Sequence, residues 1–74
     1  MEMKVAINIE YKGKDYTSDY SEMNKSDFEK LEEIAKKAAS GSLDFISFNQ
    51  ENKKIVVAKK ILLKSVISLV TKNE

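Results

Sequence analysis

Apolar and polar residues alternate along the first part of the chain. Every second position from Met3 to Tyr11 is apolar, and the positions between are mostly polar. Because successive side chains of a strand point to opposite faces, this period of two predicts a strand with one buried face. Lys12-Gly13 then supplies a two-residue turn, since glycine readily adopts the positive φ that hairpin turns need. The pattern predicts a hairpin whose second strand covers about residues 14–20.

The turn also fixes the expected register of this hairpin. The register opposes four pairs of residues: Tyr11 with Lys14, Ile9 with Tyr16, Ile7 with Ser18, and Val5 with Tyr20. Directly opposed residues share one face of a sheet. Tyr16 and Tyr20 are therefore both expected on the apolar face, at the edge of the core and with their hydroxyl groups in water.

The segment from Asn24 to Gly41 carries the signals of a helix. Asn24 is a favourable N-cap, and Gly41 is a favourable C-cap. Acidic residues concentrate in the first half, and Lys36 and Lys37 lie near the end, which complements the helix dipole. The stripe expected to face a sheet is apolar and consists of Phe28, Leu31, Ile34, Ala35 and Ala38.

Two further strands are expected after the helix. The first covers residues 43–48, where the apolar phase shifts between Phe45 and Ile46 and predicts a bulge or a strand covered on both faces. Residues 49–53 are typical of a polar turn, and residues 54–59 of another strand. We expect a hairpin in which Ile46 opposes Ile55, with the register open by one residue.

The last segment, residues 60–72, fits two structures. A helical turn followed by a strand over residues 65–71 suits its β-branched residues, and a sheet covered by one helix needs more strands than two hairpins supply. A helix would instead gather its leucines and valines on one face. We favour the strand. The expected fold is a single α+β domain over residues 1–74, an antiparallel sheet packed on one helix in the order β-β-α-β-β-β, with β-β-α-β-β-α as the alternative.

Composition removes most catalytic chemistry. The chain has neither Cys nor His, so thiol and imidazole nucleophiles and Cys/His zinc sites are excluded. No serine lies in a nucleophile elbow, and no glycine-rich phosphate loop is present. We therefore expect a protein that is not an enzyme and that binds neither a cofactor nor a metal. No apolar run approaches the ~18 residues of a membrane span, and the N-terminus lacks a signal sequence, so the expected location is the cytoplasm.

Charge gives one alternative function. All thirteen basic residues are Lys, and the net charge is +1. A cluster of five, Lys53, Lys54, Lys59, Lys60 and Lys64, could contact nucleic acid or an acidic protein. Without Arg, however, the chain lacks the bidentate side chain that reads guanine and phosphate. Nucleic-acid binding is therefore the alternative interpretation and not the favoured one.

The strongest functional signal is an excess of apolar residues in adjacent pairs between residues 43 and 70. Neighbouring residues of a strand point to opposite faces, so one helix leaves one member of each pair uncovered. An exposed apolar face of this kind is typical of a protein interface or of a homodimer. The expected contact residues are Phe45, Ile46, Val56 and Val66, together with Lys53, Lys54, Lys59 and Lys60. A third interpretation is a small ligand, such as a nucleotide signal, bound at a dimer interface.

The chain resembles small accessory proteins encoded by phages and prophages of Gram-positive bacteria. The resemblance rests on the opening hairpin Tyr11-Lys12-Gly13-Lys14-Asp15-Tyr16, on the helix that ends at Gly41 and on the closing stretch from Ile55 to Val70. Such proteins, anti-CRISPR proteins among them, often bind and inhibit a host enzyme or defence system. The resemblance thus implies a non-enzymatic inhibitor or modulator that acts by direct binding, in the cytoplasm of a host cell.

Overall fold

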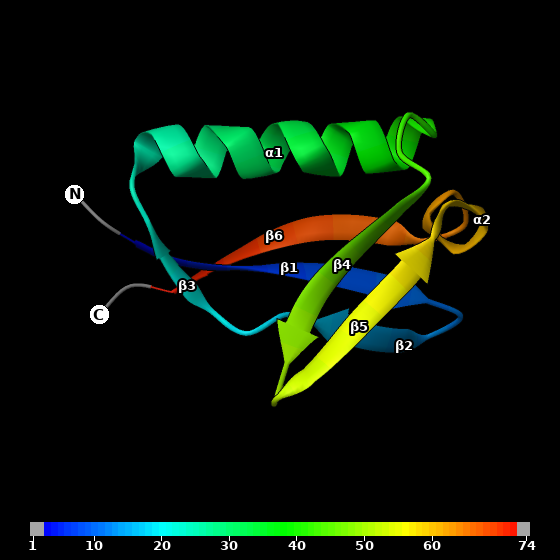
Figure 1. Ribbon diagram of the computed structural model, residues 1–74, viewed down its shortest axis with the longest axis horizontal. Helices are drawn as coiled ribbons and strands as arrows, with labels where there is room; N and C mark the ends of the chain where they lie inside the picture. The colour runs from blue at the N-terminus through cyan, green and yellow to red at the C-terminus, as the bar shows by residue number, and fades with distance from the viewer. Residues whose placement is uncertain (1–2, 73–74) are drawn as a thin grey trace.

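The computed structural model describes residues 3–72 and shows a small α+β fold (Figure 1). Its elements are β1 (Met3–Tyr11), β2 (Lys14–Thr17), β3 (Ser21–Met23), α1 (Lys25–Ser40), β4 (Phe45–Gln50), β5 (Lys53–Ala58), α2 (Lys59–Leu62) and β6 (Val66–Lys72). The predicted fold class, antiparallel sheet on one long helix, is confirmed. The predicted second strand is divided in two, and a short helix precedes the last strand.

Strand β1 is the centre of the main sheet. It pairs antiparallel with β2 and β3 along one edge and with β6 along the other. Val5, Ile7 and Ile9 are all buried, and Ile9 is completely inaccessible to solvent. The alternation in the sequence therefore does mark a half-buried strand, and its odd-numbered residues form the inner face of the sheet.

The predicted register of the first hairpin is correct only near its turn. Tyr11 pairs with Lys14 and Ile9 with Tyr16, as predicted. Val5, however, pairs with Ser21 and not with Tyr20. One extra residue is therefore inserted into the second strand, which is a β-bulge.

The bulge turns Tyr20 to the outer face of the sheet, so its predicted position on the apolar face is wrong. Lys72 Nζ lies 5.6 Å from the centroid of the Tyr20 ring, and Lys72 pairs with Lys4 at even-numbered, outward-facing positions. The cause lies at Ser18, whose Oγ accepts a 2.9 Å hydrogen bond from the Ile7 amide. This bond replaces the ladder bond that a regular strand would supply.

Strands β4 and β5 form a separate two-stranded hairpin. Ile46 pairs with Val57, so the expected pairing of Ile46 with Ile55 was wrong by two residues. Pairing is continuous from Phe45 to Gln50 without a bulge. The turn is only Glu51-Asn52, with φ of 47° and 65°. Both strands consequently lie closer to the turn than predicted, at residues 45–50 and 53–58. Positive φ at both central residues is the mark of a type I′ turn.

The interpretation of residues 60–72 as a helical turn and a strand is confirmed. Lys59–Leu62 form α2, and Val66–Lys72 form β6, which pairs with β1 over its whole length. The alternative helix is thereby excluded. The helix signals upstream are confirmed as well, since Asn24 Oδ1 accepts the Asp27 amide at 2.9 Å and Gly41 ends α1 with φ of 81°.

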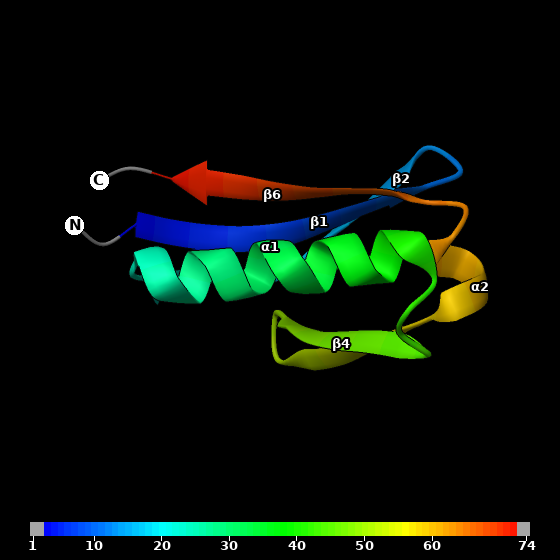
Figure 2. The same ribbon diagram turned by 90° about the horizontal axis from the view of Figure 1, so that it is seen from above.

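Helix α1 lies over the junction between the sheet and the hairpin, which stand on either side of it (Figure 2). The inner faces of the sheet and the hairpin pack together beneath the helix. The core consists of Ile7, Ile9, Ala38, Ile46, Val57 and Leu62. Because only one long helix covers these two inner faces, the side opposite α1 is covered by neither helix nor strand in the part of the chain that the structure describes (Figure 1).

Candidate functional site

The structure separates the four apolar residues that were predicted to contact a partner. Phe45, Val56 and Val66 are 57%, 60% and 64% exposed, whereas Ile46 is 8% exposed and belongs to the core. Phe45 and Ile46 are neighbours in β4, so they point to opposite faces. The structure therefore places Ile46, which was expected to contact a partner, on the covered side, and leaves Phe45 as the uncovered member of the pair.

Phe45 and Val56 share a surface, but Val66 does not. Phe45 pairs with Ala58, and Val56 precedes Ala58 by two residues on the same face of the hairpin. Val66 pairs with Glu10 on the outer face of the sheet. Since the inner faces of sheet and hairpin meet in the core, their outer faces point away from each other.

The outer face of the β4–β5 hairpin, called the hairpin face below, is exposed along its whole length. It consists of Phe45, Ser47, Asn49, Lys54, Val56 and Ala58, all of them exposed. Two large apolar side chains thus stand in water beside small polar ones. Phe45 and Val56 are diagonal neighbours across the strands, close enough to be covered by one partner residue.

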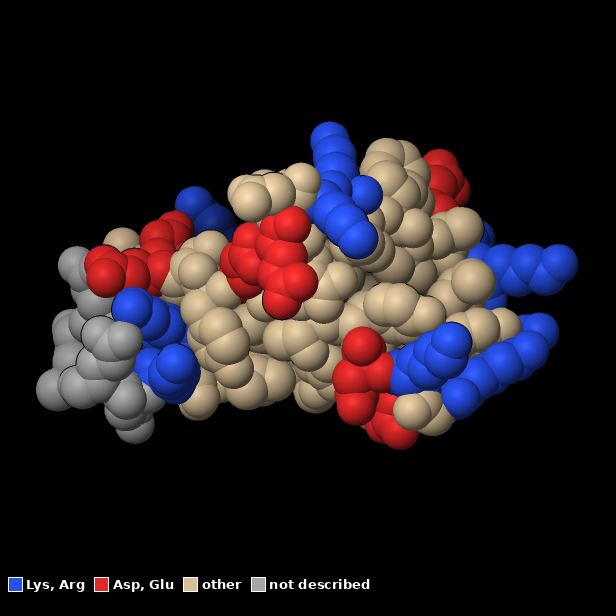
Figure 3. All heavy atoms as spheres, turned by 90° about the horizontal axis from the view of Figure 1, so that it is seen from below, with Lys and Arg blue, Asp and Glu red and all other residues tan. Residues whose placement is uncertain are grey.

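An apolar groove of about 380 Å³ lies between the sheet and β5, on the side away from α1. Its lining is Ile9, Tyr11, Tyr16, Ile55, Val56, Val57, Ala58 and Ile61. Val56 and Ala58 also belong to the hairpin face, so the groove and that face meet along β5. Seen from below, a stretch of uncharged surface runs between groups of acidic and basic side chains (Figure 3). We call the groove and the hairpin face together the β5 surface.

The free edge of β5 runs along this surface. The residues that flank a two-residue hairpin turn exchange hydrogen bonds, and pairing then alternates along the strands. The backbone groups of Lys54 and Val56 therefore point away from β4. On the other edge of the hairpin, Asn49 O points outward by the same rule and accepts the Asp19 amide at 2.8 Å. Within residues 3–72, no strand pairs with the free edge of β5.

The predicted lysine cluster is divided between the two ends of β5. Lys53 and Lys54 lie beside the turn, and Lys59 and Lys60 lie in α2. All four are exposed, but residues 55–58 of β5 lie between Lys54 and Lys59, which separates the pairs by roughly 17 Å at ~3.3 Å per residue. The α2 pair is instead close to the β1–β2 turn, at the same end of the molecule (Figure 1). There Lys12 Nζ lies 5.4 Å from the centroid of the Tyr11 ring in the groove.

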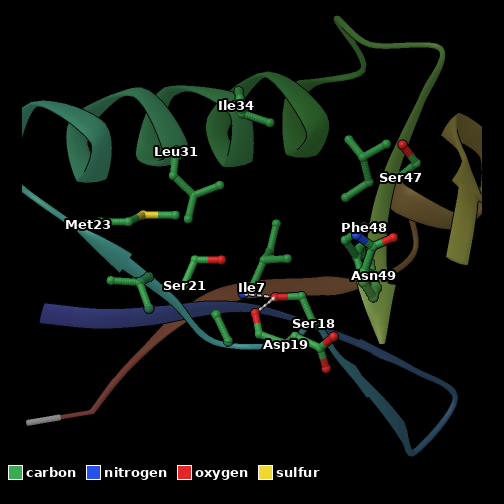
Figure 4. Close-up of a pocket in the computed structure, with 13 residues that line it drawn as sticks. Ile7, Ser18, Asp19, Ser21, Met23, Leu31, Ile34, Ser47, Phe48 and Asn49 are labelled. Carbon is green, nitrogen blue, oxygen red and sulfur yellow. Dashed lines mark hydrogen bonds between the residues drawn. The ribbon is translucent and has the colours of Figure 1, made fainter. Parts of the chain in front are cut away.

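A second cleft, of about 280 Å³, lies between α1, β3 and β4. Two of its polar side chains, Ser18 and Asp19, are bonded within the protein, and the bonds of Ser18 are drawn in Figure 4. Ser18 Oγ accepts the Ile7 amide and donates to Asp19 O, and Asp19 Oδ1 accepts the Glu51 amide at 3.1 Å. The bonds of Asp19 to Glu51 and Asn49 fasten the hairpin to the main sheet, so the cleft marks a structural junction.

Within residues 3–72, no three acidic side chains come together in an arrangement that could hold a metal ion. Neither described helix is long and apolar enough to cross a membrane.

Sequence reasoning missed the groove, although it placed several of its residues correctly. Tyr11, Tyr16 and Ile9 were expected on one apolar face, and Ile55 on a strand. What it lacked was the position of the hairpin, which stands apart from the sheet and leaves a groove between them. The sequence did contain one signal, since it predicts only one long helix. A single long helix cannot cover both sides of two packed layers.

Comparisons of the chain with protein-family models, with curated proteins and with solved structures found no match. The assignment of a function therefore depends on the surface of this chain alone.

Proposed function

We propose that this protein is a non-enzymatic protein-binding module and that the β5 surface is its binding site. The observation that carries the proposal is the continuity of the apolar groove with the exposed hairpin face through Val56 and Ala58. Large exposed apolar patches on small proteins mark interaction sites. Phe45 and Val56 remain more than half exposed although the core is only a few residues away.

The groove has the composition of an interface hot spot. Two tyrosines, Tyr11 and Tyr16, supply rigid side chains of intermediate exposure with a polar tip. Tyrosine is enriched at interface hot spots because it buries a large area and still forms hydrogen bonds. Ile55 and Ile61 supply the opposite wall. An apolar side chain of a partner would be desolvated between these walls.

The free edge of β5 specifies the form of the partner. An extended segment can add to an exposed strand through backbone hydrogen bonds, while its alternate side chains enter pockets. Here the segment would pair with the outward groups of Lys54 and Val56 and place every second side chain in the groove. Lysines at both ends of β5 favour a segment that carries carboxylates beside its apolar residues.

The phage-protein resemblance implies an inhibitor or modulator, and this proposal agrees with that class. Such a protein would act in the cytoplasm by occupying a surface of its partner. Inhibition of that type needs affinity and shape and no reactive group. The β5 surface supplies shape and affinity from residues that regular strands and α2 hold in place, so little conformational entropy is lost on binding.

The test is a selection of ligands from a displayed library of random linear peptides, followed by affinity measurement on purified peptides. We expect the enriched peptides to alternate apolar residues and to contain Asp or Glu. Val56→Lys places a charge at the rim of the groove and should weaken their binding at least tenfold. Ala39→Lys adds the same charge at an exposed position of α1, on the side away from the groove, and should change affinity less than twofold.

Equal affinity of the selected peptides for the wild type and Val56→Lys would overturn the proposal. The same holds if binding is lost equally in Ala39→Lys, because net charge and not the β5 surface would then be responsible. Circular dichroism of both variants verifies that the fold is retained, which is expected at exposed positions.

A further inference from the structure

The molecule has a second free strand edge, on β6, at the opposite side of the sheet from β2 and β3. The backbone N–H and C=O of Ile7 both bond to Ser18, on the β2–β3 side of β1. The N–H donates to the Ser18 hydroxyl and the C=O accepts from the Ser18 amide. In an antiparallel ladder the direction of these bonds alternates, so the even-numbered residues of β1 bond to β6. The partners of those residues in β6 are also even-numbered, such as Val70 opposite Ala6. The backbone groups of Ile67, Leu69 and Thr71 therefore point outward.

This edge has the properties of a pairing site. Among residues 3–72, β6 pairs only with β1, and no hydrogen bond is found for the outward groups of Ile67, Leu69 and Thr71. Proteins usually protect such edges with charge, proline or a bulge. Here the only charged residue of the strand is Lys72 at its end, and the strand contains no proline.

A shallow groove of about 330 Å³ runs beside the edge, between β6 and α1. It is lined on the strand by Ile67, Ser68 and Leu69, and on the helix by Phe28, Glu32, Ala35 and Lys36. The strand edge thus offers backbone groups together with apolar side chains that are only partly buried. Its area is separate from the β5 surface, with which it shares no lining residue.

We propose that a second copy of this chain pairs with β6, strand against strand, across a twofold axis at Leu69. An antiparallel pair of identical strands is self-complementary, because each outward N–H meets an outward C=O of the mate. Leu69 is the middle residue of β6 and one of those whose groups point outward. This register pairs Leu69 with itself and Ile67 with Thr71, so every outward group of the strand is used.

The charges of α1 favour a second copy over an unrelated strand. Residues 25–33 contain two Lys and four acidic residues, a net charge of −2, and residues 34–40 contain two Lys, a net charge of +2. The twofold axis sets the two helices antiparallel on the same face of the joined sheet. The acidic half of each helix then faces the basic half of the other, which is electrostatic complementarity of the chain with itself.

The test is the mass of the protein in solution by light scattering at about 100 µM, for the wild type and three variants. The wild type should have a mass of about 17 kDa, twice the 8.4 kDa of one chain. Thr71→Pro removes one outward N–H from an exposed residue and should raise the dimer dissociation constant about tenfold or more. Thr71→Ala keeps that N–H and should remain dimeric. Lys54→Pro removes an outward N–H from the free edge of β5 and should also remain dimeric.

A monomeric wild type at that concentration would overturn the proposal. A dimer that Thr71→Pro does not weaken would overturn it as well, because the interface would lie elsewhere. If Thr71→Pro fails to fold, Ser68→Lys replaces it, with a charge on an exposed residue next to the axis. Val56→Lys should lose peptide binding and stay dimeric, so the two proposals can fail independently. If selected peptides bind the β6 edge and dissociate the dimer, that edge accepts a foreign strand in place of the second copy.

Discussion

The two hairpins of this protein have the same turn but very different sequences. Lys12-Gly13 joins β1 to β2 with φ of 52° and 80°, and Glu51-Asn52 joins β4 to β5 with φ of 47° and 65°. The first turn contains glycine and was located to the residue. The second contains none, and its turn was predicted as a longer loop. A type I′ turn is thus recognisable when glycine accepts the positive φ and is missed when Glu and Asn are forced into it.

The strands that flank these turns differ in the same way. β1 alternates apolar and polar residues, so a shift of its register by one residue would turn its apolar face to water. β4 and β5 carry adjacent apolar residues, and a shift by two residues leaves the same residues on the same face. The predicted pairing of Ile46 with Ile55, two residues away from the observed pairing with Val57, is an error of this kind. The comparison teaches that alternation selects the face and that the turn selects the register.

The largest expected effect is a loss of stability when the core is truncated where the two hairpins meet. Ile9→Ala removes a completely buried side chain of β1 and should lower the free energy of unfolding by about 2–5 kcal/mol. Val57→Ala in β5 removes less and should cost roughly 1–3 kcal/mol. Urea denaturation of both variants measures the difference. A smaller loss for Ile9→Ala than for Val57→Ala would contradict the assignment of β1 as the centre of the fold.

The next effect is at the bulge that ends the first hairpin. Ser18→Ala leaves the amide of buried Ile7 without its hydrogen-bond acceptor and should destabilise the protein by about 1–3 kcal/mol. Ser18→Thr keeps the hydroxyl group and serves as the control. Equal stability of the alanine and threonine variants would show that the hydroxyl bond does not maintain the bulge.

A smaller effect is expected at the connection between the two hairpins. Asp19→Ala removes the carboxylate that accepts the Glu51 amide, at a cost of about 0.5–1.5 kcal/mol. Amide exchange should accelerate in β4 and β5 more than in β1 and β6, because the hairpin loses an attachment to the sheet. Asp19→Asn retains an acceptor oxygen and should exchange as the wild type does. Uniform acceleration in both sheets would contradict this role for Asp19.

The smallest effect has the opposite sign. Glu51→Asn places a residue that tolerates positive φ in the second turn and should stabilise the protein by about 0.5 kcal/mol. Lys12→Asn is the matched change in the first turn and should act similarly. Thermal unfolding measures both. Destabilisation by both variants would mean that the two turns are not the strained positions that their φ values indicate.

Much of the fold followed from local signals in the sequence. The capped helix needed only Asn24 and Gly41, and the last strand was favoured by its β-branched residues. Tyr20 could not be placed correctly, because the bulge depends on the Ser18 hydroxyl and on the bond from Asp19 to Asn49, which join distant segments. Long-range bonds of that kind leave no periodic trace in a sequence.

The candidate site was predictable in part for the same reason. Phe45, Ile46 and Val56 were expected at a contact surface, since adjacent apolar residues in a strand cannot share one core. The structure leaves Phe45 and Val56 exposed and places Ile46 in the core. Val66 was grouped with them but lies on the opposite side of the molecule, because the hairpin does not join the main sheet. The groove beside Tyr16 arises only from that separation and could not be derived from either hairpin alone.

The measurement that tests the whole account most directly is amide hydrogen exchange, residue by residue, on the free edges of β5 and β6. Ile67 and Leu69 on β6, and Lys54 and Val56 on β5, all point their amides away from the strands with which they pair. The account predicts that the β6 amides are protected in the protein alone, because a second copy covers them. It also predicts that the β5 amides exchange rapidly until a selected peptide is added and are then protected. Rapid exchange of Ile67 and Leu69 at concentrations where the dimer should form, or β5 amides that stay unprotected with peptide bound, would contradict it.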